Sequence, residues 1–232
     1  MNLSLQVSTT TAILLFAKSE KTESASKPIV SYKKQNDLLW KKMNENVLRT
    51  VQKTKLPYFI SDENSQVGNT FGEKITHAIN TVFAKGFQKV IVIGNDCPEL
   101  KLHHLLKANN QLQSHELVIG ADYHGGAYLI GVSKSGFNAD EFTAIAWQTS
   151  SVFETLQAVF SKQSIALLPC LNDCNNTFDF KKAVQNLSFS DSFRNEILSF
   201  LQHKLTINHK EISFVSYENC TLNFNKGSPF FF

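Results

Sequence analysis

Hydrophobic positions along the chain follow two spacings, and their alternation predicts strands separated by helices. Short apolar runs indicate strands, and apolar residues three or four positions apart indicate helices. The predicted strands cover 12–17, 57–61, 89–93, 116–120, 127–132 and 165–168. The predicted helices cover 37–54, 68–85, a stripe around 102–112, 149–160, 179–185 and 190–203. The remaining features are a polar loop rich in lysine and serine over 18–35 and a β-like tail over 211–217.

Strands that alternate with helices predict an α/β fold, a three-layer α/β/α sandwich around a mostly parallel central sheet. The run 89–93 is continuously apolar, which is typical of a central strand covered on both faces. No internal repeat is visible, so we expect a single domain over 1–232. Ligands of open α/β sheets bind outside the carboxyl ends of the strands. Residues that directly follow predicted strands are therefore the first candidates for a functional site.

Composition and charge narrow the class of protein. The 232 residues are 42% hydrophobic and 19% charged, which suits a chain that buries a core. A formal net charge of +3 is small for this length, so no nucleic-acid polymer or anionic membrane is expected as a partner. The apolar run 12–17 is too short to span a bilayer and follows no basic segment, so we expect a cytoplasmic protein without a membrane span.

Cysteines and aromatic residues add two smaller expectations. The four cysteines show no Cys-x-x-Cys pairing, so we expect free thiols in a reducing compartment. The chain closes on Ser-Pro-Phe-Phe-Phe, residues 228–232, and an exposed run of this kind would be sticky. We therefore expect this tail to pack on the domain or on a partner, with formation of a homo-oligomer as a weaker expectation.

Asp96 is the sharpest candidate for chemistry. It lies in Gly-Asn-Asp-Cys-Pro, residues 94–98, directly after the apolar strand 89–93. A carboxylate at this edge suits Mg²⁺ or Mn²⁺, which would neutralise the diphosphate of a leaving group. The same position equally suits the N-cap of a helix starting near Pro98, with proline as its first residue. Position alone leaves both interpretations open.

A glycine pair marks a second candidate. Gly125 and Gly126 follow the predicted strand 116–120 and precede the next one. Glycine permits positive φ and close approach of the backbone to a ligand, and it equally suits a tight turn between two strands. Lysines of the loop 18–35 suit contact with phosphate, although a lysine-rich loop is more often only solvated. The sequence contains no P-loop, nucleophile elbow or dinucleotide fingerprint.

Four ordered blocks carry a resemblance to a known family. They are QVGNTFGEKITHAINTVFAKGFQKVIVIGNDCPEL, LVIGADYHGGAYLIGV, IAWQTSSVFETL and LLPCLNDCNNTFDF. Together they resemble a bacterial family with the nucleotide-diphospho-sugar transferase fold, which is the Rossmann-like glycosyltransferase A (GT-A) fold. That family includes proposed arsenosugar-pathway glycosyltransferases and is more distantly similar to the guanylyltransferases of molybdenum-cofactor synthesis. The resemblance covers about 12–180, and a C-terminal helix and tail follow over 181–232.

The resemblance implies a glycosyltransferase or nucleotidyltransferase that uses a nucleotide-sugar or a nucleotide together with a divalent metal, Mg²⁺ or Mn²⁺. It implies metal-binding roles for Asp96 and Asp173. The residues that it implies in substrate binding are Asn95, Tyr123, His124, Gly125, Gly126, Trp147 and Thr149. Neither the resemblance nor the residues themselves single out a general base, so no catalytic residue is named.

Departures from the family pattern support an alternative. His124 stands where the family has an acidic residue, Gln148 replaces a glycine, and Asn175 replaces an aspartate. The family's first loop carries Pro-x-x-Gly-x-x-Lys-Thr-Arg, whereas this chain has KSEKTESASKPIV without a glycine. Close approach of backbone amides to a diphosphate needs a residue without a side chain. The alternative is a catalytically degenerate GT-A-like protein that binds or interacts without turnover.

Overall fold

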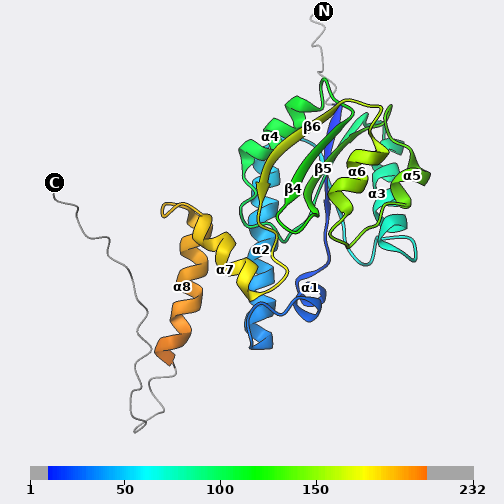
Figure 1. Ribbon diagram of the computed structural model, residues 1–232. Coiled ribbons are helices and arrows are strands. Elements are labelled where there is room, and N and C mark those ends of the chain that lie inside the picture. The colour runs from blue at the N-terminus through cyan, green and yellow to red at the C-terminus, as the bar shows by residue number, and fades with distance from the viewer. Residues whose placement is uncertain (1–9, 208–232) are drawn as a thin grey trace, which may run out of the picture.

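A six-stranded sheet covered by helices forms the body of the protein (Figure 1). The computed structural model describes residues 10–207. The strands are β1 (Thr11–Phe16), β2 (Tyr58–Ser61), β3 (Lys89–Ile93), β4 (Leu117–Asp122), β5 (Ala127–Ser133) and β6 (Ile165–Leu171). The helices are α1 (Glu20–Ser26), α2 (Lys33–Lys53), α3 (Phe71–Ala84), α4 (Leu102–Gln111), α5 (Ala139–Thr143), α6 (Val152–Val159), α7 (Thr177–Asn186) and α8 (Ser192–Ile207).

The sheet has the strand order β2-β1-β3-β5-β4-β6 and is mostly parallel. β1 pairs in parallel with both β2 and β3, and β4 pairs in parallel with β6. β5 runs against its neighbours because a short turn joins it to β4 as a hairpin, and a hairpin forces antiparallel pairing. The predicted fold class is confirmed, and the apolar run 89–93 is β3, the third strand in the sheet.

Successive residues of β1 point to opposite faces of the sheet, and both faces are buried. Ala12, Leu14 and Phe16 face the layer that contains α3, α5 and α6. Ile13 and Leu15 face the opposite layer, which contains α2 and α4. Burial on both faces explains why the strand sequence is continuously apolar and does not alternate with polar residues.

A third apolar cluster joins the C-terminal helices to α2. Trp40 of α2 is fully buried and belongs to the same cluster as Phe180 of α7 and Phe193 of α8. Figure 1 shows α7 and α8 beside α2, away from the sheet. The apolar positions of α2 therefore serve two purposes, because Val47 and Val51 pack on the sheet and Trp40 packs on the added helices.

The predicted loop over 18–35 is wrong in part, because it contains α1 and the beginning of α2. α1 has no apolar stripe, so hydrophobic spacing gives no sign of it. Buried Asn36 organises this region: its Oδ1 accepts from the N–H groups of Ile29 and Val30 at 2.9 and 3.0 Å. Its Nδ2 donates to the carbonyl of Ser24 at 2.9 Å. One buried amide thus replaces the apolar contacts that usually hold a helix.

The helix predicted to start near Pro98 is also wrong. α4 begins at Leu102, with Lys101 as its N-cap residue. Residues 97–100 form a turn in which the N–H of Leu100 donates to the carbonyl of Cys97 at 3.1 Å. Asp96 therefore caps no helix, and the helix-cap interpretation of Asp96 is excluded.

Within residues 10–207, no helix is both long enough and apolar enough to span a bilayer. The predicted β-like tail over 211–217 and the phenylalanines at 230–232 lie outside the described residues.

Candidate functional site

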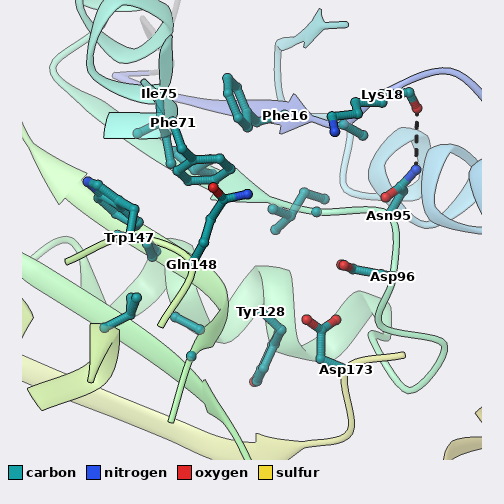
Figure 2. A pocket seen from close by; sticks show the side chains of 18 of the residues that line it. Phe16, Lys18, Phe71, Ile75, Asn95, Asp96, Tyr128, Trp147, Gln148 and Asp173 are labelled. Atoms are coloured by element: carbon teal, nitrogen blue, oxygen red, sulfur yellow. Dashed lines mark hydrogen bonds between the residues drawn. The ribbon is translucent and has the colours of Figure 1, made fainter. Parts of the chain in front are cut away.

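A pocket of about 750 Å³ opens at the carboxyl ends of β1 and β3 and at the beginning of β5. Figure 2 shows Asp96 and Asp173 at one side, with Tyr128 beside Asp173, and Phe71 and Trp147 at the other. The charged wall is made of Lys27, Asp96 and Asp173, and the aromatic wall is made of Phe16, Phe71 and Trp147. Both walls belong to the edge of the sheet where ligands of open α/β folds bind.

An ion pair between Lys27 and Asp96 dominates the charged wall. Burial by itself lowers the pKa of Lys27, and the carboxyl groups of Asp96 and Asp173 raise it above its usual value. Burial raises the pKa of Asp96, but the Lys27 ammonium and a hydrogen bond with Asp173 lower it below its usual range. Burial and the neighbouring Asp96 charge raise the pKa of Asp173 well above its usual range. The charge on Asp96 therefore favours a proton on Asp173, in a hydrogen bond between the two carboxyl groups.

Backbone contacts bring the two acidic loops together. The N–H of Cys174 donates to the carbonyl of Asp96 at 2.8 Å, which places Asp173 beside Asp96. Buried Glu99 accepts from the N–H and the side-chain amide of Asn172, at 2.8 and 3.0 Å. The loop after β3 and the loop after β6 are therefore held to each other independently of any ligand.

Packing and a helix cap position the aromatic wall. Phe71 is the first residue of α3, which starts with a capping box between Thr70 and Glu73. The ring of Phe71 lies 5.5 Å from that of Trp147, centroid to centroid, and Trp147 Nε1 donates to the carbonyl of Phe142 at 3.0 Å. The adjoining residue Gln148 has φ +63, and Figure 2 shows its side chain extending toward Phe71.

The turn between β4 and β5 is tightly built. Asp122 Oδ1 accepts from the N–H groups of His124 and Gly126, at 2.6 and 2.9 Å. Gly125 has φ +83, and a Cβ placed there would lie 1.9 Å from the carbonyl oxygen of Ser150. The turn and the close contact with Ser150 thus both require a glycine at position 125. For Gly125, the structure therefore supports the interpretation of the glycine pair as a tight turn between two strands.

Six of the nine predicted site residues line the pocket: Asn95, Asp96, Gly126, Trp147, Thr149 and Asp173. Buried Asn95 donates from Nδ2 to Asn44 Oδ1 at 2.7 Å and to the Lys18 carbonyl at 3.5 Å. Thr149 Oγ1 donates to the carbonyl of Ala146 at 2.6 Å. Both polar side chains therefore already have partners in the protein.

The other three, Tyr123, His124 and Gly125, do not line the pocket. The ring of Tyr123 has the ammonium of Lys182 4.7 Å from its centroid. His124 Nε2 lies 3.2 Å from Asp179 Oδ1. These side chains contact α7 on the other side of the hairpin turn, so their role in substrate binding stays a prediction.

Sequence reasoning missed Lys27, Phe71 and Gln148 as pocket residues. Lys27 was one of several lysines in a segment expected to be a solvated loop, and Phe71 was one apolar position of a helix. The substitution at Gln148 was visible in the family pattern. Its position directly before the predicted helix 149–160 gave no sign of which way the side chain points.

In the loop after β1 and at the start of α1, Ser19 and Thr22 bind a carboxylate of the protein itself, that of Glu63 in the loop after β2. The carboxylate of Glu63 accepts from the backbone N–H of Ser19 at 2.7 Å and from the hydroxyl of Thr22 at 2.6 Å. The hydroxyl of Ser19 also donates to this carboxylate. Hydrogen bonds from Ser19 and Thr22 lower the pKa of Glu63 to about 2. The hydroxyl and amide donors at the start of α1 are therefore already paired with a negative charge.

The charged wall does not fit a resident divalent cation. A metal ion held by the protein alone needs several ligands, whereas Mg²⁺ is more often held by one or two ionised carboxylates together with waters and substrate phosphates. Within residues 10–207, no group of three or more His, Cys, Asp or Glu side chains is arranged to hold a metal. Of the two carboxyl groups present, Asp96 is paired with the ammonium of Lys27. Asp173 Oδ1 is buried without a hydrogen-bond partner and carries the raised pKa.

Solved structures share the fold. A "putative nucleotide-diphospho-sugar transferase" from Desulfovibrio desulfuricans G20 is 23% identical with a TM-score of 0.71, and the match covers 87% of this chain and 97% of that chain. Rv0371C from Mycobacterium tuberculosis H37Rv, solved in complex with manganese, is 8% identical with a TM-score of 0.46, over 76% of this chain and 99% of that chain. Molybdopterin-guanine dinucleotide biosynthesis protein A from Archaeoglobus fulgidus is 15% identical with a TM-score of 0.37, over 75% and 95%.

No curated protein matches the chain. The similarity to the Desulfovibrio protein establishes a nucleotide-diphospho-sugar transferase fold, as the order of strands also indicates. A family described as "Uncharacterized protein conserved in bacteria (DUF2064)" matches residues 22–149, which is more than half of the 232 residues, so the protein belongs to this family.

Proposed function

We propose that the pocket binds a nucleotide or a nucleotide-sugar and that the protein is a glycosyltransferase or nucleotidyltransferase. The observation that carries this proposal is the pairing of an aromatic wall with a charged wall across one pocket of about 750 Å³. That volume lies within the range of roughly 300–1,000 Å³ that small-molecule sites occupy. Phe71 and Trp147 suit the stacking of a base or sugar ring, because every base has an aromatic face.

Three lysines of the pocket lining suit the phosphates. Lys18, Lys27 and Lys74 line the pocket from the loop after β1 and from α3. The four acidic lining residues are less available to a ligand than their number suggests. Asp122 is hydrogen-bonded within the hairpin turn, and Asp96 is paired with Lys27. A diphosphate between the lysines and a ring against the aromatic wall would place the bond to be broken over the middle of the pocket.

The residues of this chain would then act mainly by orientation. Gln148 extends from the segment after Trp147 and suits hydrogen bonding to sugar hydroxyl groups, since its amide both donates and accepts. Asp173 Oδ1 is buried without a hydrogen-bond partner in the protein and suits acceptance from a ligand hydroxyl group. Holding both substrates in one geometry lowers the barrier for transfer without a covalent intermediate on the protein.

Calorimetric titration with UDP-glucose, GDP-mannose and GTP, each with and without Mn²⁺, tests this function. Binding of at least one member in the micromolar to millimolar range is expected. Phe71→Leu keeps an apolar side chain but removes the ring, so it should weaken binding about fivefold or more. Phe178→Leu is the matched control, because Phe178 is 74% exposed and does not line the pocket. If none of the ligands binds in either buffer, the proposed function is wrong.

Binding without turnover is the second candidate. It is favoured by Glu63, whose carboxylate already engages Ser19 and Thr22 in the loop where the family carries its phosphate-loop element. Mass spectrometry of the bound ligand after prolonged incubation with mixed acceptor sugars separates the two candidates. Transfer or pyrophosphate release indicates a transferase. A ligand recovered intact, despite measurable affinity, indicates a binding protein.

A further inference from the structure

Lys27 lies beside two acidic loops that follow β3 and β6, and its ammonium pairs with Asp96 of the first of them. We infer that the ammonium of Lys27 takes the place of a divalent metal, so that the pocket binds a diphosphate group without any metal ion. The inference rests on the proposed function and names the charge that holds the phosphates.

The main chain around Lys27 is held firmly. Lys27 is the C-cap residue of α1, and its N–H donates to the carbonyl of Glu23 at 2.8 Å. Its own carbonyl accepts from Asn36 Nδ2 and from Trp40 Nε1, both at 3.1 Å. These two donors belong to α2, and both residues are buried. The backbone of Lys27 is thus anchored to the core on the side away from the pocket.

The side chain of Lys27 ends at the pocket. Its Nζ lies 5.9 Å from the centroid of the Trp40 ring and pairs with Asp96 Oδ2, and the side chain is 25% exposed. An ammonium has three N–H donors. Among the described residues, Asp96 is the one hydrogen-bond acceptor found for Nζ, so donors remain for a ligand oxygen. A firmly anchored residue therefore presents a partly exposed positive charge.

An ammonium and a divalent cation exclude each other here. Asp96 is the side chain that both would use, and it is already the partner of Lys27. A metal ion entering beside Nζ would meet like charge in a partly buried site, where charge repulsion is strong. The second carboxyl group, Asp173, holds a hydrogen bond to Asp96. The charge of Asp96, which would attract a second cation, is already balanced by the ammonium of Lys27.

A diphosphate can bind to the ammonium of Lys27 without displacing a metal ion. Its oxygens suit the remaining donors of Lys27, and Lys18 and Lys74 line the same pocket. The hydrogen bond from Asp173 can stay on Asp96 while the ammonium shares its charge between Asp96 and the ligand. Asp96 thus orients Lys27 and competes with the phosphate for it. If Asp96 were instead a metal ligand, binding of the phosphate would depend on Asp96.

Calorimetric titration of the full chain with UDP-glucose, GDP-mannose and inorganic pyrophosphate, in EDTA and in Mn²⁺, tests the inference. The expected affinity is the same in both buffers for each ligand that binds. Lys27→Met should weaken binding about tenfold or more, because it removes a charged hydrogen bond, and Lys27→Arg should retain most of the affinity. Lys107→Met, an exposed lysine of α4 outside the pocket, is the matched control and should change nothing.

Asp96→Asn separates the two roles of that residue. With Lys27 as the phosphate-binding cation, Asp96→Asn leaves binding intact or strengthens it, since the ammonium loses its competitor. With Asp96 as a metal ligand, the same change abolishes binding. The double variant Lys27→Met/Asp96→Asn removes both charges, so its fold does not depend on an unpaired buried charge. Binding should stay weak in this double variant, with a melting temperature close to that of the wild type.

Three outcomes overturn the inference. Binding that needs Mn²⁺ and disappears in Asp96→Asn would make Asp96 a metal ligand, which contradicts the inference and supports the proposed function. Undiminished binding by the double variant would show that Lys27 does not hold the ligand. Absence of binding by the wild type in both buffers would contradict the inference and the proposed function together.

Discussion

The two walls of the pocket are held in place by different forces. On the aromatic wall, Trp147 packs against Phe71 and donates its one polar hydrogen to a carbonyl of the protein. Gly72 leaves room for this packing, since a Cβ there would lie 2.3 Å from the carbonyl oxygen of Thr143. On the charged wall, Lys27 and Asp96 are held by their mutual attraction in a partly exposed place.

This difference indicates how each wall responds to a ligand. Packing contacts act over short distances, and those of the aromatic wall are already satisfied by the chain itself. Charges act over longer distances, and a phosphate competes directly for the same ammonium. The aromatic wall is therefore a rigid surface, and the charged wall is the part that exchanges partners on binding. The following predictions test this contrast.

The largest expected effect is on the aromatic wall. Trp147→Ala should lower the free energy of unfolding by about 2–3 kcal/mol, somewhat below the roughly 3–5 kcal/mol of a fully buried tryptophan, because Trp147 is only half-buried. Urea denaturation measures it, with the exposed Phe178→Ala as control, for which a change under about 0.5 kcal/mol is expected. Equal losses of unfolding free energy in the two variants would show that the packing of Trp147 does not stabilise the fold.

A smaller effect, dependent on pH, is expected on the charged wall. Burial and Asp96 raise the pKa of Asp173, so between about pH 4 and this raised pKa the folded state binds more protons than the unfolded state. The contribution of Asp173 to the stability of the wild type therefore falls as pH rises through this window. Asp173→Asn keeps a donor to Asp96 but has no proton to lose. The variant should gain in melting temperature relative to the wild type between pH 4 and pH 7.

The control for this pH effect is Asp37→Asn on α2, which does not line the pocket. Its melting temperature should follow that of the wild type across the same pH range. A difference between Asp173→Asn and the wild type that stays constant with pH would contradict a proton on Asp173 at the charged wall.

The smallest effect is expected at Gln148, which follows Trp147 in the sequence and lines the pocket. Gln148 and Lys55 have φ +63 and +58, a backbone region that costs a residue with a side chain roughly 1–2 kcal/mol. Gln148→Gly and Lys55→Gly should each raise the free energy of unfolding by about 0.5–1 kcal/mol, since glycine loses extra freedom on folding. Only Gln148→Gly should also weaken nucleotide binding, because Lys55 lies outside the pocket.

Most of the fold was predictable because the strands are buried on both faces. Continuous apolar runs such as β1 and β3 have few other uses in a chain of this size. α1 was not predictable in this way, because Asn36 and Glu63 hold the region through hydrogen bonds between distant positions. The single domain over 1–232 stays a prediction.

The candidate site was predictable from two kinds of signal, which are position after a strand and, for Trp147 and Thr149, the family resemblance. Asp96 and Gly126 lie after strands, and both line the pocket. Lys27 reaches the pocket from a helix that apolar spacing does not reveal, and its partner lies 69 positions away. The resemblance implied substrate binding by Tyr123 and His124, which stays a prediction; in the structure their side chains contact α7. Side-chain direction at a turn depends on backbone angles that the sequence pattern does not encode.

Glu63 would compete with free anions for the hydrogen-bond donors of Ser19 and Thr22, and it belongs to the same chain as those donors. A group fixed to the same chain as its binding partners acts at an effective concentration of about a millimolar or more. A free phosphate in solution must exceed that concentration to displace it from Ser19 and Thr22. Ser19, Thr22 and Glu63 do not line the pocket, so an inorganic anion that displaced Glu63 would bind outside it.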